Sequence, residues 1–172
     1  MKIILPVANL CKVEVLIDKK DKELYDKYNW QIQVYGPSVR VYAIVTKKTK
    51  GKNVNKTIYL HRYLTKCPKN KVVDHKNGNC LDNRRKNLRI CTQSQNIRNS
   101  SKTRSKTSSK YKGVYYNSSR KKWTAQICKN YKRYHLGDFD FEFLAAAAYD
   151  KKAVALFGKY AKTNLLRRSN AN

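Results

Sequence analysis

The stretch from residue 72 to residue 99 constrains the fold of this chain most, because its turn and capping signals set the order of three elements. It begins with a β-branched pair, Asn77-Gly78 is a strong tight-turn dipeptide, and an extended pattern resumes over residues 87–91. Thr92 and Gln95 then have the spacing of a capping box, which opens a helix. We therefore expect two short strands followed by a helix.

Four polar side chains of this stretch are expected to meet where the strands and the helix converge. Asp74 and His75 end the first strand, and Asn87 begins the second. Asn96 lies in the first turns of the helix and faces back toward the hairpin. A histidine beside a carboxylate, with amide side chains from the other arm, can hold one hydrated cation and activate one water.

At these residues the sequence resembles the HNH endonucleases of the ββα-metal type, particularly the homing enzymes of phages and introns. The matching words are VVDH, NGN, LDNRRKNLR and the QN of TQSQN. The resemblance implies that His75 is the general base, and that Asn87 stiffens the loop and orients the His75 ring. It also implies that Asp74 and Asn96 hold one divalent ion per active site. Carboxylate and amide oxygens are hard ligands, which suit Mg²⁺ or Mn²⁺ more than zinc.

The same segment contains several arginine side chains. We interpret Arg84, Arg85 and Arg89 as contacts to DNA phosphates, the alternative being a solvated loop. His61 is expected to pack under the site and to take no direct part in the chemistry.

The net charge limits the classes of partner. The chain of 172 residues has 39 Lys and Arg against 11 Asp and Glu, a formal net charge of +28, which points to nucleic acid. No amphipathic stretch with one purely apolar face accompanies the charge, and no apolar run of about 18 residues occurs. The apolar part of the N-terminus is too short for a secretion signal. We expect an intracellular protein that is not secreted and contacts no membrane, located in the cytoplasm of a bacterial or viral host cell or in a eukaryotic nucleus or organelle.

The five cysteines are scattered and include no CxxC pair. We therefore expect reduced, partly buried thiols and no zinc knuckle.

The segment before the motif resembles the lead-in that often precedes phage HNH motifs, which implies a small sheet packed beneath the catalytic hairpin. Trp30 is expected to anchor its core. Alternating and β-branched runs predict strands over residues 12–17, 32–35, 39–45 and 57–60. Helical patterns are expected over residues 21–28 and 61–68, and a basic loop over 47–56.

Residues 100–109 are rich in Ser, Thr and Lys, lack apolar side chains and show no period, which indicates a basic linker. In related architectures such segments follow the DNA in extended form, and this resemblance implies that Lys102, Arg104 and Lys106 contact the DNA backbone.

Beyond the linker, three strand-like runs with short connections predict an antiparallel meander; they cover residues 113–116, 123–129 and 133–136. Asp140 is expected to cap an alanine-rich helix that Gly158 closes. The side chains expected to lie against the sheet are Leu144, Ala148 and Ala155.

The words SKYKGVYY, KWTAQI, HLGDFD and AAAAYDKKAVALFGKYAKTNL resemble the DNA-binding domain of the plant ethylene-response factors (APETALA-two-like). The resemblance implies that the sheet, and not the helix, enters the major groove. The residues we expect at the DNA are Tyr116, Arg120, Lys122, Trp123, Gln126 and Arg133, with Trp123 and Gln126 as the base or sugar contacts. Cys128 and His135 stand where the plant pattern has arginine and tryptophan, so the plant GC-rich target is not expected here.

The sequence thus predicts an α+β protein with a small N-terminal sheet, a ββα-metal HNH module, a basic linker and a three-stranded antiparallel sheet packed on one helix. The expected divisions are a lead-in over residues 1–55, the HNH module over 56–99, the linker over 100–109, the ethylene-response-factor type domain over 110–166 and a tail over 167–172.

The two resemblances imply a site-specific, divalent-metal-dependent DNA endonuclease of the homing type, encoded by a mobile element and acting on double-stranded DNA without a small-molecule substrate. A single HNH centre is expected to nick one strand as a monomer, and a double-strand break would need a dimer or a second event. The alternative is a non-catalytic, sequence-specific DNA-binding regulator with a decayed nuclease module. RNA binding has no recognition-motif words to support it.

Overall fold

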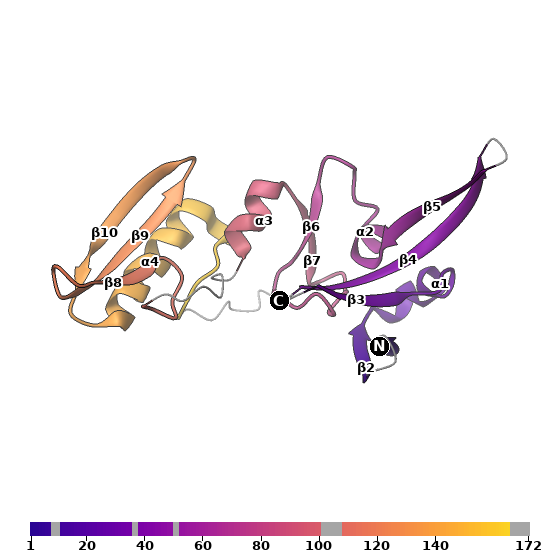
Figure 1. Cartoon of the computed structure of the whole chain (residues 1–172), viewed down its shortest axis with the longest axis horizontal. Coiled ribbons are helices and arrows are strands. Elements are labelled where there is room, and N and C mark those ends of the chain that lie inside the picture. The colour runs from indigo at the N-terminus through magenta and orange to yellow at the C-terminus, as the bar shows by residue number, and fades with distance from the viewer. Residues whose placement is uncertain (8–10, 36–37, 50–51, 101–107, 166–172) are drawn as a thin grey trace. The chain divides into compact units, whose positions relative to one another are not determined.

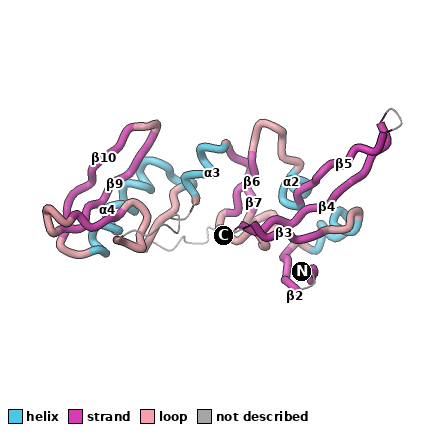
Figure 2. The backbone as a smooth tube through the Cα atoms, viewed as in Figure 1, coloured by secondary structure: helices cyan, strands magenta, loops and turns pink. Residues whose placement is uncertain are grey.

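The computed structural model describes residues 1–7, 11–35, 38–49, 52–100 and 108–165. It is a mixed α+β protein of several small antiparallel sheets, as expected, and it divides into two compact units, Met1–Asn96 and Ile97–Asn172. Figure 1 labels the elements and Figure 2 distinguishes helices, strands and loops. Each unit is described by itself below.

The N-terminal unit contains three small antiparallel sheets, β1-β2, β3-β4-β5 and β6-β7. Its elements are β1 (Lys2–Val7), β2 (Cys11–Leu16), a 3₁₀ turn (Lys19–Asp21), α1 (Lys22–Asp26), β3 (Gln31–Tyr35), β4 (Ser38–Thr49), β5 (Lys52–Tyr59), α2 (Leu60–Thr65), β6 (Val72–His75), β7 (Leu88–Cys91) and most of α3 (Gln93–Asn99).

The long β4–β5 hairpin corrects one prediction. We expected a basic loop over residues 47–56, but β4 and β5 pair without a break from Tyr42 opposite Tyr59 to Thr49 opposite Lys52. The hairpin is visible in Figure 1 as two long strands. Lysine is only weakly disfavoured in strands, so a segment rich in lysine is compatible with strand pairing. Strand β1 was also not predicted; it pairs along its whole length with β2.

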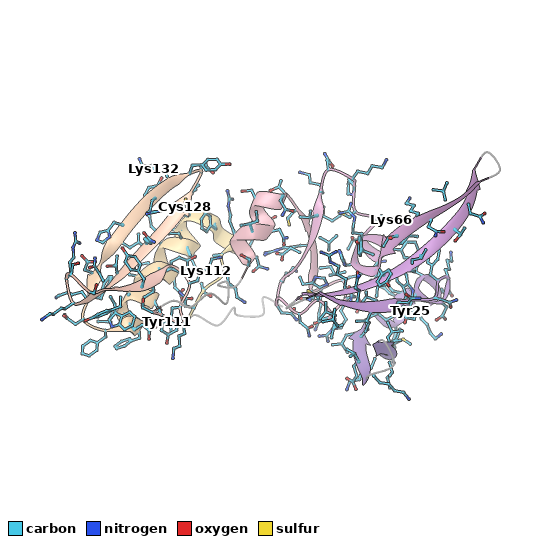
Figure 3. The ribbon with its side chains drawn as sticks, in the orientation of Figure 1. Tyr25, Lys66, Tyr111, Lys112, Cys128 and Lys132 are labelled. Atoms are coloured by element: carbon cyan, nitrogen blue, oxygen red, sulfur yellow. The ribbon has the colours of Figure 1, made fainter. Side chains whose placement is uncertain are left out.

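The core of the N-terminal unit lies between the sheets and α2. Val15, Ile17, Leu60 and Leu64 are almost fully buried there. Trp30 is buried in the same core, as predicted, and its indole Nε1 donates to the backbone oxygen of Tyr25 at 2.6 Å. This hydrogen bond satisfies the indole N–H, the one polar group of the ring, which burial would otherwise leave without a partner. Figure 3 labels Tyr25 at this position.

The C-terminal unit is the predicted meander with one packed helix. Its strands are β8 (Val114–Asn117), β9 (Lys122–Lys129) and β10 (Lys132–Phe139), arranged in the order β10-β9-β8. They are followed by α4 (Glu142–Phe157) and a 3₁₀ turn (Gly158–Tyr160). In Figure 1, α4 lies along one face of the sheet. The face that α4 covers carries Val114, Ala125 and Ile127.

The helix begins and packs differently from the prediction. Its N-cap residue is Phe141, without a side-chain cap, and Asp140 instead pairs with Lys122 at 3.0 Å. Ala148 is half-buried and packs against the core, as predicted, but Leu144 and Ala155 are exposed. The fully buried small residues of the helix are Ala145, Ala146 and Ala153. With four consecutive alanines, the apolar pattern did not identify which stripe faces the sheet.

Gly113 allows the close approach of helix and sheet. It has a positive φ of 75°, and a Cβ atom there would lie 2.2 Å from the Tyr149 ring. Only glycine fits both the conformation and the contact.

Within the described residues, no helix combines the length and apolarity needed to cross a bilayer. The cysteines whose side chains are described, Cys67, Cys80, Cys91 and Cys128, are free thiols.

Candidate nuclease site and DNA-reading face

The predicted general base His75 and the predicted metal ligand Asp74 lie at the end of β6. The β6–β7 register sets Asp74 opposite Arg89 and His75 opposite Leu88. Because side chains alternate along a strand, Asp74 and His75 project from opposite faces of this two-stranded sheet. Both are buried, with 4% and 8% of their surfaces exposed.

The His75 ring is held by groups from two other elements. Its Nε2 lies 3.4 Å from Oδ1 of Asn83, and the His61 ring packs edge-on against it with ring centres 5.4 Å apart. Burial is the main cause that lowers the pKa of His75, although Asn83 and the nearby carboxylates oppose it. A histidine with a lowered pKa is neutral at neutral pH, the form that a general base needs.

His61 lies at the start of α2, stacked on Tyr59 with ring centres 6.0 Å apart. Burial, followed by the nearby His75, lowers the pKa of His61 to about 4. It therefore remains uncharged beside His75 at neutral pH.

Asn83 was not among the predicted site residues, and it makes the contact to His75 that we had expected of Asn87. Its Nδ2 donates to the backbone oxygen of Cys80 at 3.2 Å, so its Oδ1 is the atom that faces the imidazole. An acceptor at this position favours the tautomer with the proton on Nε2. The sequence signal for Asn83 is the word LDN, in which it is the asparagine. The prediction uses Asn87, the second asparagine of LDNRRKN.

Asn87 instead fastens the loop that connects β6 and β7. Its Oδ1 accepts from the backbone N–H of Asn77 at 3.0 Å, and its Nδ2 donates to the backbone oxygen of Asp82 at 2.8 Å. This buried amide thus ties the two ends of the loop together. Its contacts are those of a residue that stiffens the loop beside the histidine.

The loop is also docked on the N-terminal sheet. Leu16 of β2 donates its N–H to the oxygen of Leu81 at 2.9 Å, and its own oxygen accepts from the N–H of Asn83 at 2.7 Å. The lead-in and the HNH module therefore form one folded body, and β2 positions the residue that contacts His75.

Arg84 and Arg85 have carboxylate partners that sequence reasoning missed. Arg84 binds both oxygens of Asp82 at 2.7 Å. Arg85 makes a bidentate pair with the buried Asp21, with Nη2 at 2.6 Å from Oδ1 and Nε at 2.9 Å from Oδ2. A guanidinium fork matched to a carboxylate holds its side chain in a fixed geometry. Both arginines thus brace the loop from within.

Asp74 and Asn96 are the residues predicted to hold a divalent ion. The Asp74 carboxylate accepts from Arg89 at 2.7 Å from Nε and 2.5 Å from Nη2, so Arg89 also has an internal partner. Asn96 is half-buried on α3, a helix opened by the predicted capping box between Thr92 and Gln95. Carboxylate and amide oxygens form a hard donor pair that suits Mg²⁺ or Mn²⁺.

No group of three or more His, Cys, Asp or Glu side chains able to bind a metal occurs among the described residues. Of the two predicted ligands, only Asp74 belongs to these residue types, because Asn96 would bind through an amide oxygen.

The strand register of the C-terminal domain defines an open sheet face. Ala125 and Ile127 of β9 pack toward α4, so the alternate residues of β9 point to the other side. Cross-strand partners extend this face to β8 and β10, with a bulge between His135 and Gly137. The residues of the open face are Tyr115, Asn117, Lys122, Thr124, Gln126, Cys128, Arg133, His135 and Asp138. Figure 3 labels Cys128 on β9.

Three of the predicted DNA contacts, Lys122, Gln126 and Arg133, lie on this open face. Trp123 and Tyr116 do not. They are register partners on the helix side, where their rings meet edge-on with centres 5.1 Å apart and Trp123 packs against the core. Residues three apart on a strand face opposite ways, so Trp123 and Gln126 do not share a face.

Arg120 precedes β9 and pairs with Asp138 of the open face at 2.5 Å. Thr124 donates its hydroxyl to the same carboxylate at 2.6 Å. These hydrogen bonds, that of Thr124 first, lower the pKa of Asp138. The remaining predicted contacts, Lys102, Arg104 and Lys106, lie outside the described residues.

Comparison with known families finds two domains in this chain. Residues 61–98 match the family described as HNH endonuclease, and residues 109–158 match the AP2 domain. A protein of Acanthamoeba polyphaga mimivirus, named as an uncharacterized HNH endonuclease, is 35% identical over 111 residues, which is 61% of this chain. The aligned part covers 56% of that relative, so the chain spans about half its length.

The chain therefore carries a domain of the HNH nuclease family followed by an AP2 DNA-binding domain, in the order that the two resemblances indicated. Both families bind DNA, which supports DNA as its partner.

Proposed function

We propose that this chain is a site-specific, divalent-metal-dependent DNA endonuclease of the homing type that nicks one strand. The observation that carries the proposal is the buried His75 ring beside Asn83, within the segment that matches the HNH family. The buried ring is neutral at neutral pH and is held from two sides, which are the requirements for a general base.

His75 would take the proton from the attacking water. With Nε2 protonated and directed at Asn83, Nδ1 is the nitrogen that carries the lone pair. The water oxygen forms a bond to phosphorus, the bond from phosphorus to the leaving oxygen breaks, and the water proton moves to Nδ1. Asn83 orients the ring, and Asn87 holds the loop that presents Asn83.

We propose Asp74 and Asn96 as the ligands of one Mg²⁺ or Mn²⁺ ion. When bound, such an ion supplies positive charge for the scissile phosphate and the leaving oxygen. Arg89 would orient the Asp74 carboxylate through the hydrogen bond that its Nε donates. Its guanidinium also places a positive charge next to this carboxylate.

DNA recognition is proposed to reside on the open sheet face of the AP2 domain. Gln126 is the candidate for base contact, because an amide side chain can both donate and accept at a base edge. Arg133 and Lys122 would contact phosphates, as would Arg120 when it leaves Asp138.

One HNH centre contains the chemistry for one strand, so we propose that a monomer nicks and that a double-strand break needs two copies or two events. We further propose that the enzyme belongs to a mobile element and acts inside a cell, where double-stranded DNA is available.

The test is cleavage of supercoiled plasmid carrying the gene's flanking DNA, with Mg²⁺, with Mn²⁺ or with EDTA. Wild type should produce metal-dependent open circles. His75→Ala should lower the rate by about 10²–10⁴-fold, the range of general-base catalysis, while the gel shift in EDTA is unchanged. Linear product would indicate paired cuts, and equal loss of binding and cleavage would refute the assigned role of His75.

One observation favours a second function, that of a non-catalytic DNA-binding regulator. The Asp74 carboxylate already has a counter-charge in Arg89, so its burial alone does not require a metal ion. Wild-type protein that shifts the plasmid but leaves it supercoiled with both metals would establish this alternative.

A further inference from the structure

The turn between β9 and β10 contains a tyrosine in an unfavourable conformation. The register pairs Lys129 with Lys132, which leaves Asn130 and Tyr131 as a two-residue turn. Both have positive φ angles, 51° and 64°, as a type I′ turn requires. Glycine suits the second position of this turn, whereas a bulky side chain there is an outlier.

Within the part of the chain that the structure describes, the Tyr131 side chain gains no packing that would offset this conformation. It is fully exposed, at 104% of the reference surface. Tyr134 on the same hairpin is different, because it is half-buried and lies under the ammonium groups of Lys132 and Lys152 at 5.6 and 5.7 Å from the ring centre. Strained residues of this kind are concentrated at binding sites.

The surroundings of the turn indicate the chemistry of the ligand. Lys129, Lys132 and Arg133 flank Tyr131, and the sequence from residue 123 to residue 137 contains no Asp or Glu. The first carboxylate after the turn, Asp138, is already paired with Arg120. Cys128 and Lys132, labelled in Figure 3, mark this end of the hairpin. A ring flanked by three cationic side chains, at the end of this sheet face, suits a polyanion with apolar edges.

We propose that Tyr131 is a DNA-contacting residue that packs its ring against sugar and base edges of the duplex, next to the stretch read by the open face. An aromatic ring supplies a large contact area at low conformational cost, and apolar side chains that enter a groove pack against base steps. The inference rests on the proposed function only in requiring that the AP2 domain binds duplex DNA. It does not require cleavage.

The experiment uses the full-length chain in EDTA and a short fluorescent duplex selected from a random pool by the wild type. Tyr131→Gly should weaken binding by about five-fold, the low end of what aromatic contacts to bases contribute. The same substitution should raise the melting temperature, because glycine adopts the turn without strain. Affinity and stability are thus expected to change in opposite directions, which a merely structural role would not produce.

Two matched variants complete the test. Asn130→Gly changes the same turn without removing the ring, and it should bind like wild type. Tyr131→Phe keeps the ring without the hydroxyl and should also bind like wild type. Wild-type affinity in Tyr131→Gly would overturn the proposal, as would a Tyr131→Phe variant as weak as Tyr131→Gly, since that would assign the contact to the hydroxyl. Failure of the wild type to select any duplex would overturn DNA reading itself, a result distinct from these.

Discussion

In the N-terminal unit, the polar side chains around β6 and β7 are buried and bonded to one another, whereas those of the AP2 domain stand on an open sheet face. His75, Asn83 and Asn87 are each less than a tenth exposed. Gln126 and Arg133, by contrast, project from the face of their sheet that is opposite α4. Chemistry at a phosphate needs groups fixed to a fraction of an ångström, and recognition needs groups that solvent and DNA can reach. Arginine braces the loop in the N-terminal unit, whereas in the AP2 domain we propose that Arg133 contacts DNA.

The largest expected difference concerns acid stability. The pKa of His61 is lowered to about 4, so the unfolded chain binds a proton near pH 6.5 that the folded chain does not. The contribution of His61 to the free energy of unfolding should therefore be fully present above about pH 6.5. It should fall by about 3 kcal/mol as the pH drops toward 4. The lowered pKa of His75 acts in the same direction. Urea unfolding at a series of pH values measures the fall.

The control for this prediction is His61→Gln, which keeps a polar side chain but cannot titrate in this range. Its stability should change less between pH 6.5 and 4 than that of wild type. An identical fall in both proteins would mean that the buried imidazole is not the acid-sensitive group.

The next largest effect should separate the two kinds of arginine. Arg85→Met leaves the buried Asp21 carboxylate without its guanidinium, and we expect a loss of about 2 kcal/mol in the free energy of unfolding, after allowing for the partial exposure of Arg85. Arg133→Met should leave stability unchanged and weaken DNA binding. Denaturant unfolding and fluorescence anisotropy measure the two quantities.

Arg85→Lys sharpens the comparison, because it keeps the charge but loses the fork that matches the Asp21 carboxylate. It should be intermediate in stability. If Arg85→Met unfolds at the wild-type midpoint and binds DNA weakly, Arg85 is the phosphate contact that its sequence position first indicated, and the contrast between the units fails.

The smallest effect tests the two faces of the AP2 sheet. Gln126→Ala removes an open-face amide and should cost about 1 kcal/mol of binding energy with little change in stability. Trp123 lies on the helix side of the sheet and packs against the core. Trp123→Leu should therefore lower the melting temperature of the C-terminal unit, while each folded molecule still binds DNA. Wild-type stability of Trp123→Leu together with weakened binding would contradict the assignment of faces.

Local signals in the sequence determined the elements of both modules. The turn dipeptide at Asn77-Gly78, the capping box at Thr92 and the short connections of the meander are read over a few residues, and each agrees with the structure. Charge misled the same reasoning at residues 47–56, since an exposed hairpin tolerates lysine as readily as a loop does. The motif words likewise led to both domain families.

Only the tertiary structure decided which side chains meet. Asn83 reaches His75 because β2 holds its backbone, and Arg85 meets an aspartate 64 residues earlier in the chain. The face taken by Trp123 was decided by the helix that covers the sheet, since alternation shows which residues share a face but not which face is buried. Period and capping are local properties of the chain, whereas partners and faces arise from contacts between segments that the sequence does not place side by side.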